Sequence, residues 1–287
     1  MDKIHIKLNN LQQSLKELGS AAIAFSGGVD STFLLKVAHQ VLADRALAIT
    51  AISGLFPERE ITEANELVIA EGIRHILYEM DEFAIAGFAE NPVNRCYLCK
   101  KYLFSCFLEI TARQGIPYLL EGSNVDDDRD YRPGNIAVRE LGVLSPLREA
   151  GLTKTEIRRL SNEMGLPTWN KPSFACLASR FPYGETITRE KLKAVETSER
   201  LLFDLGFNQV RVRRHGRLAR IEVHPDEMEK LTSPGIREAI YAGIKQTGFT
   251  YVTLDMQGYR TGSMNEISDC TSICTAYPLV ESVETGA

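Results

Sequence analysis

The stretch AFSGGVDST at residues 24–32 is the strongest sequence indication of the fold, because it follows an apolar run at 21–25 and opens a helical pattern. Glycine accepts positive φ and has no Cβ, so Ser26, Gly27 and Gly28 can wrap the backbone closely around an anion. Backbone N–H groups there and the N-terminus of the following helix favour negative charge. The stretch lacks the lysine of the GxxxxGKS/T loop and the spacing of GxGxxG. We expect a phosphate-binding turn of another kind; the alternative is a glycine-rich turn that binds nothing.

Short apolar runs alternate with helical patterns through the first half of the chain. Strands that alternate with helices imply a parallel sheet with helices on both faces, and ligands bind such sheets at the carboxyl ends of the strands. The expected fold class is therefore α/β, a doubly wound parallel sheet. Thr153 and Glu156 fit a capping box that opens a helix ending near Met164. The other elements expected in this half are strands at 21–25, 46–53, 74–80 and 118–122, and helices at 31–43, 62–72 and 97–114.

After about residue 185 the pattern changes to that of a second, smaller α+β domain. Residues 209–224 alternate apolar and charged side chains around His215-Gly216, which predicts a hairpin. The tail from about Glu266 has weak periodicity, which predicts partial disorder. The other elements expected here are helices at 188–205 and 234–246 and a strand at 250–255.

The composition is that of an ordinary globular protein of 287 residues, with 44% hydrophobic and 25% charged side chains. The formal net charge of -5 argues against general affinity for nucleic acid. No apolar run approaches the length of a membrane span, and the N-terminus lacks the continuous apolar region of a secretory signal. We therefore expect a cytoplasmic protein with no nucleic-acid or membrane partner. Thiols stay reduced there, so a CxxC pair is more often metal-binding or catalytic than a disulfide.

The SGGxDS pattern between a strand and a helix resembles the PP-loop pyrophosphatase superfamily. The resemblance implies an enzyme that cleaves ATP between its α and β phosphates, adenylates a carbonyl or carboxylate oxygen of its substrate, and holds the pyrophosphate in the loop. A nucleophile then displaces AMP. The resemblance also implies that Asp30 helps to hold Mg²⁺ and that Ser26 and Ser31 bond phosphate oxygens, with Gly27 and Gly28 shaping the loop around ATP.

A second polar loop, EGSNVDDDRDYRPG at 121–134, follows a predicted strand. Gly122 would let a nucleotide pack against the backbone, which adds it to the expected ATP-binding residues. Arg132 is a candidate contact to phosphate or substrate. The run Asp126–Asp128 is better interpreted as a solvated acidic loop.

Three further stretches narrow the choice: WNKPSFACLASRFPYG at 169–184, VRVRRHGRLARIE at 210–222 and TLDMQGYRTGSMN at 253–265. Together with SGGVDS and DYRPG they resemble the LarE family nearly end to end. The resemblance implies a sulfur transferase that adenylates a carboxylate of pyridinium-3,5-biscarboxylic acid mononucleotide and converts it to a thiocarboxylate. The product leads to the nickel-pincer nucleotide, the cofactor of lactate racemase. The partners implied are this small nucleotide, sulfide or another sulfur donor, and further copies of the chain in a homo-oligomer, with a hexamer as one candidate.

With this resemblance, the chain is expected to divide into four parts. They are a PP-loop ATP-binding domain at 1–170, a substrate and cysteine loop at 171–185, an α+β substrate-binding and oligomerisation domain at 186–265, and the tail at 266–287.

Arginines in the matching stretches suit a substrate with a phosphate and two carboxylates. Arg211 and Arg213 stand two apart on a predicted strand, so both side chains face the same way. Guanidinium groups bind phosphate and carboxylate bidentately. Solvated surface positions are the alternative for such residues, and they suit Arg214 and Arg217 better. By resemblance, Ser179, Arg180, Arg211, Arg213 and Arg260 grip the substrate phosphate, and Glu199 and Glu222 match carboxylates near the sulfur site, although both could be ordinary surface residues.

The stretch NRCYLCKK at 94–101 carries Cys96 and Cys99 three residues apart. Two chemistries are known in the LarE family. In one, a single cysteine matching Cys176 gives up its own sulfur and becomes dehydroalanine, so that each protein molecule acts once. In the other, three cysteines hold a [4Fe-4S] cluster whose fourth iron binds an extra sulfide. The single-use type lacks the CxxC pair, so this chain is expected to be of the cluster type, with ATP and Mg²⁺ as its other cofactors.

Other interpretations of the thiols fit less well. A structural zinc needs four ligands, and neither a second CxxC nor histidines at ligand spacing supply them. Nothing else in the chain resembles a thioredoxin-type redox protein. Cys106 lies seven residues beyond Cys99 in an apolar stretch, about 10.5 Å along a helix, so a core thiol is its better interpretation. Cys176 is then the natural third ligand, because cysteine thiolates usually hold such clusters.

Two other functions compete with a sulfur transferase acting on a small nucleotide. A PP-loop tRNA thiolation enzyme would be expected to bring a basic RNA-binding surface or zinc modules, and the sequence indicates neither. A nucleotide-binding regulator would not need the combination of an intact SGGVDS loop, cysteines and arginines.

Overall fold

The computed structural model describes residues 2–129, 134–172, 175–260 and 263. They form two compact units. The first, here unit 1, comprises Met1–Ala178 and Tyr183–Lys193, and the second, unit 2, comprises Ser179–Pro182 and Ala194–Ala287. The assignment of separate roles to the expected domains remains a prediction. Within the described ranges, every helix is too short or too polar to traverse a lipid bilayer.

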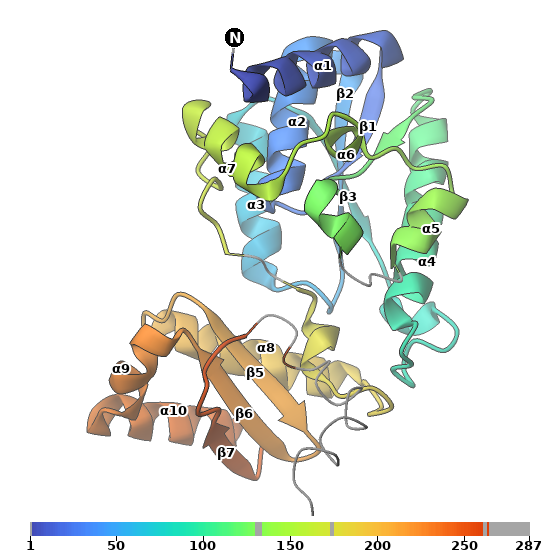
Figure 1. Ribbon diagram of the computed structural model, residues 1–287. Coiled ribbons are helices and arrows are strands. Elements are labelled where there is room, and N and C mark those ends of the chain that lie inside the picture. The colour runs from blue at the N-terminus through green and yellow to red at the C-terminus, as the bar shows by residue number, and fades with distance from the viewer. Residues whose placement is uncertain (1, 130–133, 173–174, 261–262, 264–287) are drawn as a thin grey trace, which may run out of the picture. The chain divides into compact units, whose positions relative to one another are not determined.

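Unit 1 contains a parallel four-stranded sheet with the strand order β3-β2-β1-β4 (Figure 1). Successive strands add on one side of β1 as far as β3, and β4 then pairs on its other side. The predicted α/β fold with a doubly wound parallel sheet is confirmed. The strands are β1 (Ala21–Ala24), β2 (Ala46–Ile52), β3 (Arg74–Glu79) and β4 (Leu119–Leu120).

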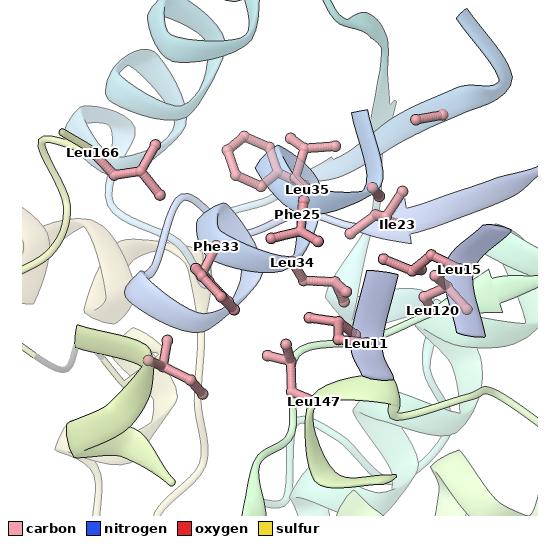
Figure 2. Packing of buried hydrophobic residues seen from close by; sticks show 14 of the residues in the cluster. Leu11, Leu15, Ile23, Phe25, Phe33, Leu34, Leu35, Leu120, Leu147 and Leu166 are labelled. Atoms are coloured by element: carbon pink, nitrogen blue, oxygen red, sulfur yellow. The ribbon is translucent and has the colours of Figure 1, made fainter. Parts of the chain in front are cut away.

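Helices cover both faces of this sheet, and the strand residues alternate between them. Ala21 and Ile23 belong to the core under one group of helices, whereas Ala22 belongs to the core on the other face. Figure 2 shows part of the first core, where Leu11 and Leu15 of the N-terminal helix lie near Ile23 of β1 and Leu120 of β4. The helices of the first face are α1 (Lys3–Leu18), α2 (Val29–Leu42), α3 (Glu58–Ala70), α6 (Pro146–Glu149) and α7 (Lys154–Glu163), and those of the second are α4 (Arg95–Arg113) and α5 (Gly134–Glu140).

Two features of unit 1 differ from the sequence-based expectations. The N-terminal segment forms α1, although it showed only scattered apolar residues. Its buried residues Ile4, Leu8, Leu11 and Leu15 recur at helical spacing, which gives the helix one narrow apolar stripe. The strand expected at 118–122 is only two residues long. The capping box is confirmed, because Thr153 and Glu156 bond each other's backbone at the start of α7.

Unit 2 is built around a three-stranded mixed sheet of order β5-β6-β7. β5 and β6 are antiparallel and form the predicted hairpin, while β7 runs parallel to β6. The turn is Gly216-Arg217, and Gly216 has a φ of 60°, a conformation that hairpin turns assign to glycine. The strands and helices of this unit are β5 (Val210–His215), β6 (Leu218–Val223), α9 (Met228–Thr232), α10 (Pro234–Gln246), β7 (Tyr251–Leu254) and α8 (Arg189–Asp204), whose residues up to Lys193 belong to unit 1. The short 3-10 helices of the chain are η1 (Ala43–Arg45), η2 (Glu82–Ala84), η3 (Val125–Arg129), η4 (Leu177–Arg180) and η5 (Pro225–Glu227).

Candidate active site

The loop of the SGGVDS motif connects β1 to α2 at the carboxyl end of a central strand. Gly27 has a φ of 69°, and a Cβ on it would lie 2.9 Å from the Cβ of Ala64 on α3. Its conformation and its neighbour therefore both require glycine. Gly28 is the N-cap of α2 and brings no side chain to bond the first N–H groups of the helix. Such a helix start favours an anion.

The two serines of the loop are bonded to each other. The hydroxyl oxygens of Ser26 and Ser31 lie 3.1 Å apart, and the backbone N–H of Ser26 donates to the hydroxyl of Ser31 at 3.3 Å. The Ser31 hydroxyl in turn reaches the carbonyl of Gly28 at 3.3 Å. Two hydroxyls therefore stand side by side in the loop, each able to donate to a phosphate oxygen.

Gly122 lies at the point where the sheet changes direction, just after β4. Ligands bind doubly wound sheets at this switch point. A Cβ on Gly122 would lie 3.1 Å from the backbone nitrogen of Ser31 and 3.3 Å from the carbonyl carbon of Asp30. The glycine therefore lets the loop after β4 approach the first turn of α2 closely, at the place expected for the nucleotide.

Asp30 is bonded by a lysine that the sequence analysis missed. The ammonium of Lys154, the first residue of α7, lies 2.5 Å from the Oδ2 of Asp30. The amide of Asn124 donates to Oδ1 of the same carboxylate at 3.4 Å. Burial raises the pKa of Asp30 above its ordinary value, against the lowering effect of Lys154. A partly buried carboxylate and a movable cation thus stand together beside the phosphate loop.

Two aspartates of the acidic run after β4 bond residues next to Asp30. Asp126 and Asp127 are half-buried, which corrects the expectation of a solvated acidic loop for these two residues. Asp126 accepts from the backbone N–H of Lys154 at 2.8 Å, and Asp127 accepts from the backbone N–H of Asn124 at 2.9 Å. Their carboxylates therefore position the residues that contact Asp30. Arg132 lies outside the described residues.

Cys96, Cys99 and Cys176 all belong to unit 1 and act on one another electrostatically. Cys96 and Cys99 lie at the start of α4, and Cys176 directly precedes η4; all three thiols are half-buried. Burial and the neighbouring Cys176 raise the pKa of Cys96, against the influence of Arg95. Burial, Cys176 and Cys96 raise the pKa of Cys99 to about 12. The fold therefore brings the three thiols into one neighbourhood.

Cys106 has a different environment, because its thiol interacts with the hydroxyl of Tyr78 on β3. The ring of Tyr78 packs edge-on against Phe107, with centroids 6.1 Å apart. Among the side chains that the structure describes, no three histidine, cysteine, aspartate or glutamate groups are already arranged as metal ligands. The three neighbouring thiols are thus of a kind that binds metal ions, but they are not yet arranged as metal ligands.

In unit 2, Arg180 and Glu199 form a bidentate pair shut off from solvent. The Nε and Nη2 of Arg180 donate to the two carboxylate oxygens at 2.8 and 2.9 Å, and Glu199 also accepts from the backbone N–H of Val212 at 2.9 Å. Burial alone would raise the pKa of Glu199, but Arg180 outweighs it and holds that pKa below its ordinary value. Arg180 also donates to the Ser179 hydroxyl at 2.8 Å.

A second buried pair joins Arg213 on β5 to Glu222 on β6. Arg213 donates to both carboxylate oxygens at 3.1 and 2.9 Å and to the carbonyl of Ser179 at 3.1 Å. Ser263 bonds both partners. Glu199 and Glu222 are 3% and 0% exposed, so the interpretation of these two as surface residues is wrong.

The two other arginines of the predicted set have distinct surroundings in unit 2. Arg211 is buried with its guanidinium 5.0 Å from the ring centroid of Tyr259, and burial, together with Arg180, lowers its pKa to about 10. Arg260 donates to Asp255 at 3.0 Å and is only partly buried. Arg211 and Arg213 on β5 and Arg180 on η4 are all buried in this unit, and such a group of guanidinium groups suits an anionic ligand.

A parallel sheet of this topology with an SGGVDS loop at its switch point is the architecture of the PP-loop proteins. The chain is 26% identical to one component of the glutamine-hydrolysing GMP synthase of Archaeoglobus fulgidus, over 56% of its own length and 55% of that protein. No protein-family model matches the chain.

A more similar relative defines the family within this class. The chain is 37% identical to the pyridinium-3,5-bisthiocarboxylic acid mononucleotide synthase of Lactiplantibacillus plantarum, over 93% of this chain and 96% of that protein. It therefore belongs to the LarE family. An uncharacterized protein of Synechocystis sp. is 45% identical over 91% of this chain and 97% of its own length.

The sequence patterns did not identify the residues that contact the predicted site from distant parts of the chain. Lys154 and Asn124 contact Asp30, and Arg95 acts on Cys96. The position of Lys154 directly after the capping threonine was a local signal, since the first turn of a helix is an unusual place for a lysine. Nothing local distinguishes Asn124.

Proposed function

We propose that the protein is an ATP-dependent sulfur transferase that converts a carboxylate of pyridinium-3,5-biscarboxylic acid mononucleotide to a thiocarboxylate, for biosynthesis of the nickel-pincer nucleotide. Membership of the LarE family supports the substrate class and the product. The single observation that carries the proposal is the electrostatic neighbourhood of Cys96, Cys99 and Cys176 in the unit that also carries the phosphate loop.

In the first step, an oxygen of the substrate carboxylate attacks the α-phosphorus of ATP. The bond from that phosphorus to the β-phosphate oxygen breaks, and pyrophosphate leaves into the loop formed by Ser26, Gly27, Gly28 and Ser31. Asp30 has the hard oxygen donors that Mg²⁺ prefers. Asp30 would hold the metal, and the ammonium of Lys154 would then be available to a phosphate oxygen.

The substrate phosphate is assigned to unit 2. Ser179, Arg180, Arg211, Arg213 and Arg260 supply hydroxyl and guanidinium donors there, and Glu199 and Glu222 hold two of the guanidinium groups in fixed orientations. Fixed arginines bind an anion with little further ordering of their side chains. Arg132 is retained as an additional candidate contact.

In the second step, sulfur at the oxidation level of sulfide adds to the activated acyl carbon with its own electron pair, and AMP leaves with the former carboxylate oxygen. The three thiols fit a [4Fe-4S] cluster in number and type, since three cysteines leave one iron without a protein ligand. When bound, such a cluster would supply sulfide through that iron. Cys96, Cys99 and Cys176 would hold it as thiolates, so that loading of the cluster would release their protons.

Anaerobic reconstitution with iron and sulfide tests the sulfur source. We expect about four irons per chain and a broad absorption near 400 nm, both lost in Cys96→Ala. The contrary outcome is a chain that binds no iron and whose Cys176 becomes dehydroalanine after one turnover, which would show that Cys176 is itself the donor. Cys106→Ala, with its thiol beside Tyr78, is the matched control and should retain the iron.

The oligomer and the compartment complete the proposal. We assign the chain to a cytoplasmic homo-oligomer, with a hexamer as the candidate to test, because unit 2 carries exposed aromatic residues at Tyr241 and Tyr251. Mass measurement of the native protein across a concentration series tests this: a mass that stays at that of one chain would refute it.

A further inference from the structure

The guanidinium of Arg95 is buried beside the three cysteines. Neither the proposed ATP step nor the proposed substrate contacts use this arginine. It is the first residue of α4 and is 4% exposed. Its Nη1 donates to the side-chain oxygen of Asn91 and, at 3.0 Å, to the carbonyl oxygen of Ala178. Its Cζ lies 5.9 Å from the ring centroid of Tyr183. All these residues belong to unit 1.

No carboxylate in the described part of the chain lies within ion-pair distance of Arg95. A buried charge is normally paired, because the loss of hydration is otherwise not compensated. The acidic group on which Arg95 acts directly is the thiol of Cys96, by a hydrogen bond and by its charge; it also acts on Cys99 through charge. Lys100 also acts on Cys96, and Glu82 acts on Cys99. The cation is therefore placed to compensate anionic sulfur.

The bonds of Arg95 also fix the segment that carries the third cysteine. Ala178 is two residues beyond Cys176, and its carbonyl is held by the first residue of the helix that carries Cys96. Asn91, the other partner of Arg95, accepts from the backbone N–H of Gly184 at 2.9 Å. One guanidinium thus connects the start of α4 to the segment that follows Cys176.

We propose that Arg95 is a positioning residue of the sulfur site, which holds Cys176 beside Cys96 and Cys99 and supplies the positive charge that anionic sulfur requires there. The inference deepens the proposed function and rests on it for the identity of the sulfur carrier. The juxtaposition of the thiols, however, is a property of the cofactor-free chain and can be measured without any cluster.

Arsenite tests this inference in the cofactor-free protein, because trivalent arsenic takes up to three thiolates. The wild-type chain should bind one arsenic through three sulfur atoms, as measured by native mass and by the sulfur-to-arsenic absorption, and Cys176→Ser should bind it through two. Arg95→Met should approach the two-sulfur spectrum and lose affinity roughly tenfold or more, as changes next to metal ligands do. Arg95→Lys retains the charge and should recover part of the affinity.

Arg113→Met is the matched control, since this arginine ends the same helix but is exposed and pairs with Glu109. Circular dichroism and the thermal midpoint of every variant show whether the fold is intact at the temperature of the titration. If Arg95→Met unfolds, Arg95→Lys carries the comparison through its sulfur count. Undiminished three-sulfur binding in the Arg95 variants overturns the inference, whereas a wild-type chain that binds arsenite but no iron overturns the proposed cluster and leaves the role of Arg95 standing.

Discussion

Glu199 receives both arms of the Arg180 guanidinium, at 2.8 and 2.9 Å, while Arg180 is 0% and Glu199 3% exposed. Both charges are therefore buried, and each one compensates the loss of hydration of the other. Removal of one partner leaves an uncompensated charge in unit 2, which is far more costly than the loss of a surface ion pair.

The first prediction is that Arg180→Met lowers the free energy of unfolding by about 3–5 kcal/mol, the usual consequence of breaking a buried pair from one side. Urea unfolding of the full chain measures this. Arg159→Met is the control, because Arg159 makes exposed ion pairs with Asp2 and Glu163 and should change the stability little. Equal effects of the two substitutions would contradict the assignment.

The second prediction concerns how the free energy of unfolding changes as the pH falls. The pKa of Glu199 is lower in the folded chain than in the unfolded one, where it is about 4.3. Its contribution is therefore fully present above the unfolded pKa and is lost as the pH falls through the folded value. Urea midpoints between about pH 3 and pH 7 should fall less steeply with acid in Glu199→Gln than in the wild type. Parallel curves would refute this.

The third prediction concerns Lys154. If its ammonium turns from Asp30 to a phosphate, Lys154→Ala should weaken Mg·ATP binding roughly 10- to 150-fold, since a charge-assisted hydrogen bond contributes about 1.5–3 kcal/mol. Calorimetric titration with an ATP analogue that resists cleavage between the α and β phosphates provides the measurement. Lys7→Ala is matched to it, because Lys7 forms a similarly exposed pair with Glu156 on the same helix. An equal loss of affinity in Lys7→Ala would contradict a contact between Lys154 and phosphate.

The fourth prediction concerns the close approach at Gly122. A methyl group there would press on the backbone of Ser31 at 3.1 Å and on that of Asp30 at 3.3 Å. Gly122→Ala should therefore reduce ATP affinity in the same titration. Gly235→Ala is the control, because a Cβ at Gly235, near the start of α10, meets no atom within 4 Å and should leave ATP binding unchanged. Unchanged binding in Gly122→Ala would show that the loops move apart freely.

The sequence predicted the elements whose signals are local. The strand, glycine turn and helix around Ser26 carry their own pattern, as do the hairpin at Gly216 and the capping box at Thr153, and each was found in place. The helix α1 was missed because only four positions of its sixteen residues face the core, so its polar residues mask the periodicity.

The parts that escaped prediction depend on residues far apart in the chain. The partner of Asp30 is 124 residues away, and the burial of Glu199 depends on an arginine 19 residues earlier together with a strand that follows it. Whether a charged residue is buried is decided by such tertiary pairing, which a single sequence does not display. The neighbourhood of Cys96 and Cys176 also joins distant parts of the chain, but here the resemblance to a family, and not a local pattern, had predicted it.

The contact between Gly27 and Ala64 has a consequence for tolerance to mutation. Position 64 lies on α3 and has no proposed chemical role of its own, yet its methyl group faces the phosphate loop, because a Cβ added to Gly27 would lie only 2.9 Å from it. In a scan of all substitutions scored by growth or by activity, position 64 should accept little beyond alanine and glycine. Position 64 would then be sensitive to mutation without contacting a ligand. Its sensitivity would come from the limited space beside the phosphate loop.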